Sequence, residues 1–265
     1  MRPFLKWAGN KYRLMRQLKA ILPEATRLIE PFAGSAAVFL NTDYQHYLLA
    51  ETNDDLINLY QYVQCEGVSF IEYCQTFFNS VNNNSSCYYD LREQFNSTQD
   101  LRRKAALFLY LNRHGYNGLC RYNANGRYNV PFGQHLKPYF PYKEMLAFHH
   151  KAQNAVFAHA DFQTTLQLAR PGDVVYCDPP YLPLTATANF TQYSAKGFSL
   201  AEQQTLAKQA EQLASRGIPV VISNHDHQLI AELYKTAEII RFPVQRTISR
   251  NAKERKAIME VLAIF

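Results

Sequence analysis

The sequence lacks three features that would each define a class of protein. No apolar run approaches the roughly 20 residues needed to cross a bilayer, and residues 1–6 show no apolar stretch of a signal peptide. The five cysteines are scattered and form no CxxC pair, which argues against a disulfide framework and a zinc site. A G-x-G-x-x-G turn for a dinucleotide is also missing. We expect a cytoplasmic protein with no membrane segment and no metal.

Acidic residues are absent from one long segment. Residues 101–143 contain eight of the 28 Lys and Arg residues but no Asp or Glu, which leaves 20 basic against 22 acidic residues elsewhere. The whole excess of the +6 net charge therefore arises in this segment. Nine Phe and Tyr residues are interleaved with the basic ones. This pattern suits phosphate neutralisation and base stacking by a nucleic-acid-binding protein. A solvated basic face is the alternative.

The remaining pattern alternates strands and helices. Short apolar runs typical of strands lie at residues 27–30, 47–50, 156–158, 173–177, 218–222 and 261–265. Helical patterns lie at residues 36–40, 101–112 and 200–215, and residues 56–95 are mostly helical in pattern. This order predicts an α/β domain interrupted by an inserted helical, basic domain.

The most informative motif is Asp178-Pro179-Pro180-Tyr181, which directly follows the predicted strand 173–177. Proline has no N–H for the sheet, so the strand ends here. In open α/β sheets, ligands bind at the carboxyl ends of the strands. The Asp178 carboxylate and the Pro179 carbonyl can accept the two hydrogens of an amino group on a planar base, while Tyr181 stacks on its ring. An Asp-Pro turn that only ends a strand is the alternative, and these four residues alone do not decide.

The predicted strand at residues 27–30 is also followed by a turn that contains a glycine, Gly34. Glycine there allows a close backbone approach to a nucleoside, and the N-terminus of a helix follows. Glu51 lies 17 residues further on, about where dinucleotide folds place the acid that holds a ribose. A tight turn and an acid at a helix start are the alternatives. The turn has no room for a pyrophosphate, which favours a nucleoside without phosphates, such as S-adenosylmethionine.

Four stretches in this order resemble the Dam family of DNA adenine-N6 methyltransferases, which act at GATC sites. They are residues 4–11 (FLKWAGNK), 30–37 (EPFAGSAA), 111–122 (LNRHGYNGLCRY) and 178–181 (DPPY). The resemblance covers nearly the whole chain, and the order is that of the alpha group of amino-methyltransferases. It implies a Rossmann-like, S-adenosylmethionine-dependent methyltransferase sheet formed by residues 1–55 and 145–265. Residues 56–144 would form an inserted, mostly helical DNA-recognition domain.

The resemblance also assigns functional residues. The catalytic residues would be Asp178, Pro179 and Tyr181. The residues expected to bind S-adenosyl-L-methionine are Trp7, Ala8, Gly9, Lys11, Phe32, Gly34, Glu51, Asp161, Phe162 and Asp178. The residues expected to bind DNA are Lys6, Arg113, Tyr116, Asn117, Leu119, Arg121, Pro131 and Lys137. The implied enzyme is a cytoplasmic monomer, bacterial or phage-encoded, which is associated with the nucleoid and acts on double-stranded DNA that contains GATC.

Within the cofactor set, the residues at positions 7–11 would touch the methionine part and Glu51 the ribose, while Asp161 and Phe162 flank the adenine ring. Within the DNA set, Arg121 would pair with guanine, the commonest specific contact. The remaining roles implied by the family are contact with the thymine methyl by Leu119 and Pro131, wedging into the base stack by Tyr116 with help from Asn117, and approach to the outer guanine by Lys6. The target adenine would be flipped out of the duplex, and its amine would attack the methyl group in line.

The chain departs from the family pattern at four positions. Asn10 and Ala36 stand where the family usually has glycine, and Glu51 stands where aspartate is commoner. Gln134 replaces an arginine that grips a phosphate beside the recognition site. We expect cofactor binding to survive these changes, because alanine is small and the longer glutamate still reaches two hydroxyls.

Three other functions compete with this interpretation. Glutamine-side-chain methyltransferases resemble this fold but usually carry Asn-Pro-Pro-Tyr and lack the basic insertion. A catalytically inactive DNA-binding module is disfavoured by the intact DPPY motif, and a nicotinamide oxidoreductase by the missing glycines. The stretch SNHD at residues 223–226 is interpreted as a structural loop near the site, since its spacing offers no closed set of metal ligands.

Overall fold

The computed structural model describes residues 1–181, 198–245 and 257–265. The chain forms two compact units, one of Met1–Ile21 with Ala33–His159 and one of Leu22–Phe32 with Ala160–Phe265. The predicted domain boundaries at residues 55/56 and 144/145 both fall inside the first unit, so that division stays a prediction. Among the described residues, no helix is long and apolar enough to cross a membrane.

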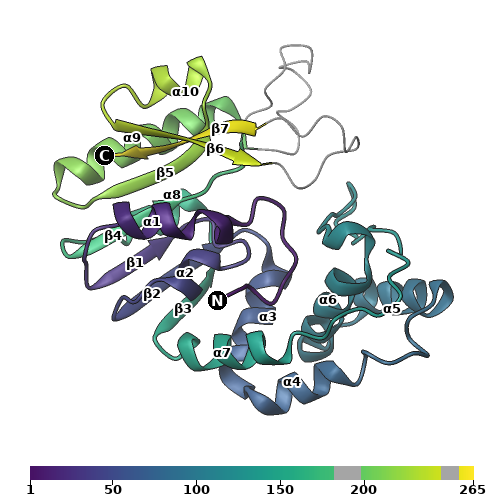
Figure 1. The fold of residues 1–265 in the computed structure, drawn as a ribbon. Helices are drawn as coiled ribbons and strands as arrows, with labels where there is room; N and C mark the ends of the chain where they lie inside the picture. Colours follow the sequence, from purple (N-terminus) through teal and green to yellow (C-terminus); the bar gives the residue numbers. More distant parts are fainter. Residues whose placement is uncertain (182–197, 246–256) are drawn as a thin grey trace. The chain divides into compact units, whose positions relative to one another are not determined.

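The first unit contains two parallel strands and most of the helices (Figure 1). Its elements are η1 (Lys11–Leu14), α1 (Met15–Ile21), α2 (Ala37–Asn41), β2 (His46–Glu51), α3 (Asp54–Glu66), α4 (Val68–Gln75), α5 (Ser85–Ser97), α6 (Leu101–His114), η2 (Tyr116–Gly118), α7 (Tyr142–Ala152) and β3 (Ala155–His159). β2 pairs with β3 in parallel, with Leu48 opposite Val156.

Helix α6 is the central helix of the helical part of this unit. Residues 105–112 are all buried, and α3, α4 and α5 pack against the helix. Asp100 caps its N-terminus by accepting a hydrogen bond from the Arg103 N–H. Burial on nearly all sides explains why the predicted helix 101–112 forms so regularly. It also gives a rigid support to the predicted DNA-contacting residues that follow it.

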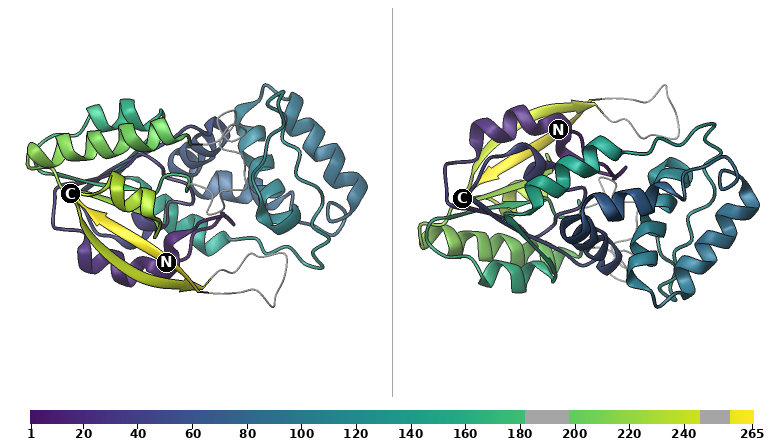
Figure 2. Two further views of the ribbon diagram at one scale, coloured as in Figure 1. Left: turned by 90° about the horizontal axis from the view of Figure 1, so that it is seen from above. Right: turned by 90° about the horizontal axis from the view of Figure 1, so that it is seen from below.

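The second unit contains a five-stranded sheet in the order β1-β4-β5-β7-β6. Its elements are β1 (Arg27–Glu30), α8 (Phe162–Gln167), β4 (Asp173–Cys177), α9 (Leu200–Ser215), β5 (Val220–His225), α10 (Gln228–Leu233), β6 (Glu238–Gln245) and β7 (Ala257–Ile264). The first three strands are parallel, and β7 runs antiparallel to both β5 and β6. Both views in Figure 2 show the yellow strand β7, which leads to the C-terminus, beside β6.

Strand β4 is the buried centre of this sheet. All five of its residues are buried, and helix α9 packs against the neighbouring strand β5. A strand covered on both faces reads as a continuous apolar run, as Val174 to Cys177 does. Helix α9 begins with a capping box between Ser199 and Glu202. The α/β fold predicted from the sequence is therefore confirmed, and β4 delivers the DPPY motif at its carboxyl end.

Candidate active site and DNA-recognition segment

The DPPY motif lies beside the end of strand β5. The parallel register places Cys177 opposite Ile222, so Asp178 comes level with Ser223. The Ser223 hydroxyl donates to Asp178 Oδ1 at 2.8 Å. The Tyr181 hydroxyl donates to Glu260 Oε2 at 3.3 Å, and its ring lies 4.4 Å from the ring of His225. Burial raises the pKa of the Tyr181 phenol, so its ring stays neutral.

Three phenylalanines of the second unit form an aromatic cluster. Phe32 stacks on Phe162 with ring centroids 5.6 Å apart, and Phe198 meets both rings edge-on, at 5.4 and 5.2 Å. Asp161 caps helix α8 by accepting a hydrogen bond from the Thr164 N–H at 2.7 Å. This hydrogen bond lowers the pKa of the Asp161 carboxyl. Phe32 and Phe162 belong to the predicted cofactor set, whereas nothing in the sequence indicated that Phe198 joins them.

In the first unit, the glycine turn and the predicted ribose acid contact each other directly. The Gly34 N–H donates to Glu51 Oε2 at 3.2 Å, and a Cβ at Gly34 would come within 2.9 Å of Trp7 Nε1. The Tyr60 hydroxyl donates to the Gly34 carbonyl at 2.5 Å. Glycine is required at this turn because its φ is +44° and the Trp7 ring occupies the space of a side chain. Trp7, Gly34 and Glu51, three of the residues predicted to bind the cofactor, thus lie together.

The N-terminal motif is ordered by a short helical turn. The Lys11 ammonium is buried and donates to the Gly9 carbonyl at 3.2 Å, whereas Ala8 and Gly9 are exposed. Asn10 caps η1 by accepting from the Tyr12 N–H at 2.8 Å, with φ of −50°. Position 10 therefore needs no glycine, and its asparagine stabilises the turn that presents Lys11.

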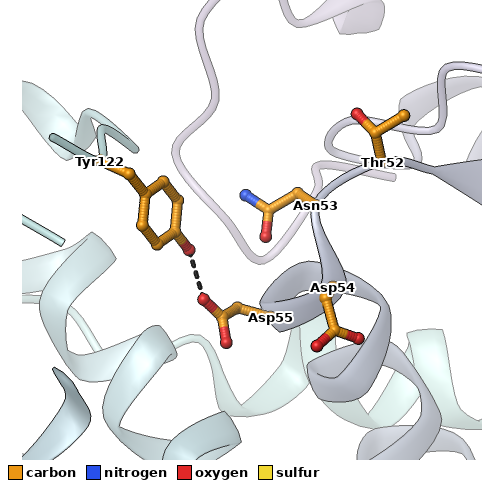
Figure 3. A pocket seen from close by; sticks show the side chains of 5 residues that line it. All are labelled: Thr52, Asn53, Asp54, Asp55 and Tyr122. Atoms are coloured by element: carbon orange, nitrogen blue, oxygen red, sulfur yellow. Dashed lines mark hydrogen bonds between the residues drawn. The ribbon is translucent and has the colours of Figure 1, made fainter. Parts of the chain in front are cut away.

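A polar pocket of about 320 Å³ opens just beyond Glu51 and connects to the recognition segment (Figure 3). Its lining residues are Thr52, Asn53, Asp54, Asp55 and Tyr122. The Tyr122 hydroxyl donates to Asp55 Oδ2 at 2.6 Å, and Lys104 pairs with the same carboxylate at 2.7 Å. The Asn53 amide donates to the sulfur of Cys120 at 3.4 Å. The residues on both sides of Arg121 are thus attached to the start of helix α3.

The predicted DNA-contacting residues that follow α6 lie on a compact loop. The Tyr116 N–H donates to the Pro131 carbonyl at 2.9 Å, and the Tyr128 hydroxyl donates to the Leu119 carbonyl at 2.8 Å. Tyr116 is 51% exposed, and Asn117 has a left-handed backbone with φ of +54°. An exposed aromatic side chain on a tight turn is the geometry that a wedging residue requires.

The guanidinium of Arg121 is exposed and oriented by Asn129. Its Nε donates to Asn129 Oδ1 at 2.7 Å, and its Nη2 donates to the Asn129 carbonyl at 3.2 Å. The outer edge of the fork remains available for a base. Arg113 differs, because it is half-buried and donates to the carbonyls of Tyr139 and Phe4. Burial lowers the pKa of Arg113.

Lys6 is attached to the same loop, although it lies over 100 residues earlier in the chain. Asn112 accepts from the Lys6 N–H at 2.9 Å and donates to the carbonyls of both Lys6 and Gly118. The Lys6 ammonium contacts His135 Nε2 at 3.3 Å. Burial is the main reason that the pKa of Lys6 is lowered, and the positive charge of Arg113 adds to the effect. Lys6 therefore lies with the predicted recognition residues.

The basic segment carries less free charge than its composition suggested. Arg102 pairs with Glu66 and Lys104 with Asp55, and Arg127 pairs with Glu93. These carboxylates come from α3 and α5, outside the segment, so the charge imbalance along the sequence is partly neutralised in space. Lys137 and Arg121 are exposed, and within the described residues neither forms an ion pair. Two basic side chains of α6 and one of the loop that follows it are thus paired with acids, and the choice between a nucleic-acid surface and a solvated basic face stays a prediction.

Comparisons with known proteins identify the family of the chain. The model of the D12 class N6 adenine-specific DNA methyltransferases matches residues 7–248. The chain is 50% identical over 265 residues to a DNA adenine methylase of Serratia marcescens, covering 100% of this chain and 98% of that protein. It is 49% identical over 264 residues to the DNA adenine methylase of Escherichia coli K12, covering 100% and 95%. This chain belongs to the D12 class of N6 adenine-specific DNA methyltransferases.

Membership of the D12 class confirms the family predicted from the sequence. The chain is an enzyme of adenine-N6 methylation in DNA, and the class implies a methyl donor. An oxidoreductase and a glutamine methyltransferase are thereby excluded. Sequence reasoning missed the contacts of Ser223, Glu260 and Gln203 with the DPPY motif. The SNHD stretch does not form a loop at Ser223, because β5 continues to His225. The polar residues that directly follow the apolar run at residues 220–222 were the signal that could have identified Ser223 as a partner of the DPPY motif.

Proposed function

We propose that this D12 enzyme methylates the N6 amino group of adenine in GATC sites of duplex DNA, with S-adenosylmethionine as the donor. The observation that carries the proposal is the DPPY motif, held at the carboxyl end of a buried strand with its aspartate and tyrosine each hydrogen-bonded to a polar side chain. The enzyme acts as a monomer, with residues 56–144 as the target-recognition domain.

The side chains in the cofactor set suit S-adenosylmethionine. The Trp7 ring packs closely against the Gly34 turn, in the space that a Cβ would need. Glu51 Oε2 accepts only the Gly34 N–H within the described residues, so it retains a lone pair for a ribose hydroxyl. We assign the methionine part to Trp7, Ala8, Gly9 and Lys11, the pocket wall to Phe32 and Gly34, the ribose to Glu51, and the adenine ring to Asp161 and Phe162.

Once bound, the cofactor supplies an electrophilic methyl group. The chain's own task is to present the amine. Asp178 and the Pro179 carbonyl accept its two hydrogens and thereby direct the nitrogen lone pair, while Tyr181 stacks on the flipped base. Holding the reactants in line converts binding energy into rate, because it removes the entropic cost of their encounter.

The duplex is assigned to the loop after α6. Arg121 contacts guanine, Leu119 and Pro131 the thymine methyl, and Tyr116 with Asn117 the gap left by the flipped adenine. Lys6 approaches the outer guanine. Arg113 and Lys137 complete the set, Lys137 as a phosphate contact. The support is that six of these residues lie in the segment that follows α6, while Arg113 belongs to the last turn of that helix and Lys6 is hydrogen-bonded to Asn112 of the same helix.

The test is to express the gene in a host without adenine methylation and to digest plasmid DNA with nucleases that are blocked by, or require, methylated GATC. Protection by the wild type is expected. Asp178→Ala should leave less than about a hundredth of the methyl-transfer rate, while duplex binding stays unchanged because phosphate contacts dominate affinity. The exposed Asp90→Ala is the control. More than a tenth of the rate in Asp178→Ala would overturn the catalytic role.

A duplex with a fluorescent adenine analogue at the target position tests flipping, since unstacking the analogue raises its emission. Emission unchanged on binding would contradict flipping. Methylation at sites other than GATC would leave the family assignment intact and correct the specificity.

A further inference from the structure

Three residues of the DPPY motif are each held by a polar side chain from a different element, and two of these side chains, Ser223 and Gln203, are buried. Ser223 on β5 donates to Asp178, and Glu260 on β7 accepts from Tyr181. From helix α9, the Gln203 amide donates to the Pro180 carbonyl at 3.0 Å. The motif is therefore surrounded by three polar side chains that hydrogen-bond to it, and it is not simply the end of a strand.

The first contact fixes one oxygen of the aspartate. Ser223 is 0% exposed, and its oxygen lies 3.1 Å from the Tyr176 hydroxyl, itself only 2% exposed. Since the Ser223 hydroxyl has one hydrogen, donation to Asp178 means that Tyr176 donates to Ser223. A chain of two hydrogen bonds thus ends at Asp178 Oδ1 and orients the carboxylate.

The contact from Gln203 to the Pro180 carbonyl fixes the backbone of the motif. Gln203 is 0% exposed, and its Oε1 accepts from the Asn224 amide and the Tyr234 hydroxyl, each at 3.3 Å. These two donors determine which end of the amide is the oxygen, so the Nε2 group must face Pro180. Each of these polar groups costs free energy to bury unless it is hydrogen-bonded. A satisfied buried network gives rigidity, because every member has one favoured orientation.

We propose that Ser223 and Gln203 are positioning residues for methyl transfer, which preorganise Asp178 and the Pro179–Pro180 backbone for the target amine. The inference rests on the proposed catalytic role of the DPPY motif. Neither residue touches the reacting atoms, so both act through geometry alone. A displacement of about 1 Å in a reacting group can cost 10²-fold in rate.

The experiment measures single-turnover methyl transfer, cofactor affinity, duplex affinity and thermal stability for two pairs of variants. Ser223→Ala is paired with Ser215→Ala, an exposed serine of the same unit, and Gln203→Met with Gln204→Met, the exposed neighbour on the same helix. We expect the rate constant to fall about tenfold to a hundredfold for the two buried variants. Both dissociation constants and the control variants should remain within about twofold of wild type.

Tyr176→Phe gives a second route, since it removes the hydroxyl behind Ser223 and keeps the ring. A severalfold fall in rate with unchanged binding is expected. Rates within twofold of wild type in folded Ser223→Ala and Gln203→Met would overturn the inference. So would a loss of cofactor affinity in proportion to rate, because that marks a general structural role. An active Asp178→Ala would instead overturn the proposed function, so the two failures are distinguishable.

Discussion

Two residues that depart from the family pattern show how a single position is tolerated. Asn10 has φ of −50°, so a side chain there causes no strain. Ala36 has φ of +56° and is fully buried before helix α2. A left-handed alanine costs about 1–2 kcal/mol relative to the right-handed form, a cost that glycine at this position would avoid. The sequence identified both departures, but only the backbone angles distinguish the neutral one from the strained one.

A buried histidine should make stability depend on pH. Burial lowers the pKa of His114 to about 4, and its ring stacks on Tyr110 at 4.0 Å. Above about pH 6.5 the group is neutral in both states and contributes nothing. Between about pH 6.5 and 4 the unfolded chain binds a proton that the folded chain does not, so stability falls as the pH falls. The loss reaches on the order of 2–3 kcal/mol near pH 4.5.

The variant His114→Phe keeps an aromatic ring against Tyr110 and cannot take up a proton. Denaturant unfolding at several pH values should show the wild type losing stability relative to the variant on acidification. At about pH 7 to 8 the difference between them should be constant. A pH-independent difference down to about pH 4.5 would mean that folded His114 titrates normally.

At the scale of elements, the regular strands and helices were predictable, and the exceptions have physical causes. Strand β4 and helix α9 have the bounds predicted for them, because one is a continuous apolar run and the other has a capping box. Strand β6 was missed because Pro243 interrupts its apolar pattern. Proline is tolerated there since β6 is the edge of the sheet, where an N–H is not needed on the outer side.

The recognition loop should read sequence mainly through Arg121. Asn129 holds this guanidinium, and Tyr122 anchors the adjoining residue to Asp55. Arg121→Ala should weaken binding to GATC by about 1–3 kcal/mol and leave binding to a scrambled duplex almost unchanged. Competition binding with the two duplexes measures the ratio. Arg127→Ala is the matched control, because that side chain pairs with Glu93. Equal losses on both duplexes would identify Arg121 as a phosphate contact.

At the scale of the molecule, electrostatic attraction to DNA depends on fewer charges than the sequence contains. Several basic side chains of residues 101–143 are neutralised by acids from elsewhere in the fold. Such pairings lie between residues up to 49 apart in sequence, so composition alone could not predict them. The motifs of the candidate site could be identified from the sequence because each is a short local stretch, whereas the distant partners Ser223, Gln203 and Glu260 of the DPPY motif could not.

Adding one charge on the recognition loop should therefore be measurable. Gln134 is exposed with φ of +52°, where arginine fits as well as glutamine. Gln134→Arg should tighten binding to all duplexes at low salt and steepen the slope of log affinity against log salt by about 0.9. Discrimination between GATC and scrambled DNA should not change, because phosphate contacts carry no sequence information.

The matched control is Gln75→Arg, an exposed position at the end of helix α4, outside the predicted recognition residues. It adds the same charge and should leave the slope nearly unchanged. Equal slopes for the wild type and Gln134→Arg across a salt titration would show that residue 134 does not face the phosphate backbone.

The contact between Gly118 and Lys6 limits which substitutions and which chimaeric sequences the fold can accept. Gly118 has φ of +64°, and a Cβ there would overlap the Lys6 side chain. Asn112 joins the backbones of both residues. A chimaera that takes its first ten residues from one parent and its recognition loop from another must keep all three positions compatible. We therefore expect substitutions at residues 6, 112 and 118 to be coupled, so that a change at one position is tolerated only with a compensating change at another.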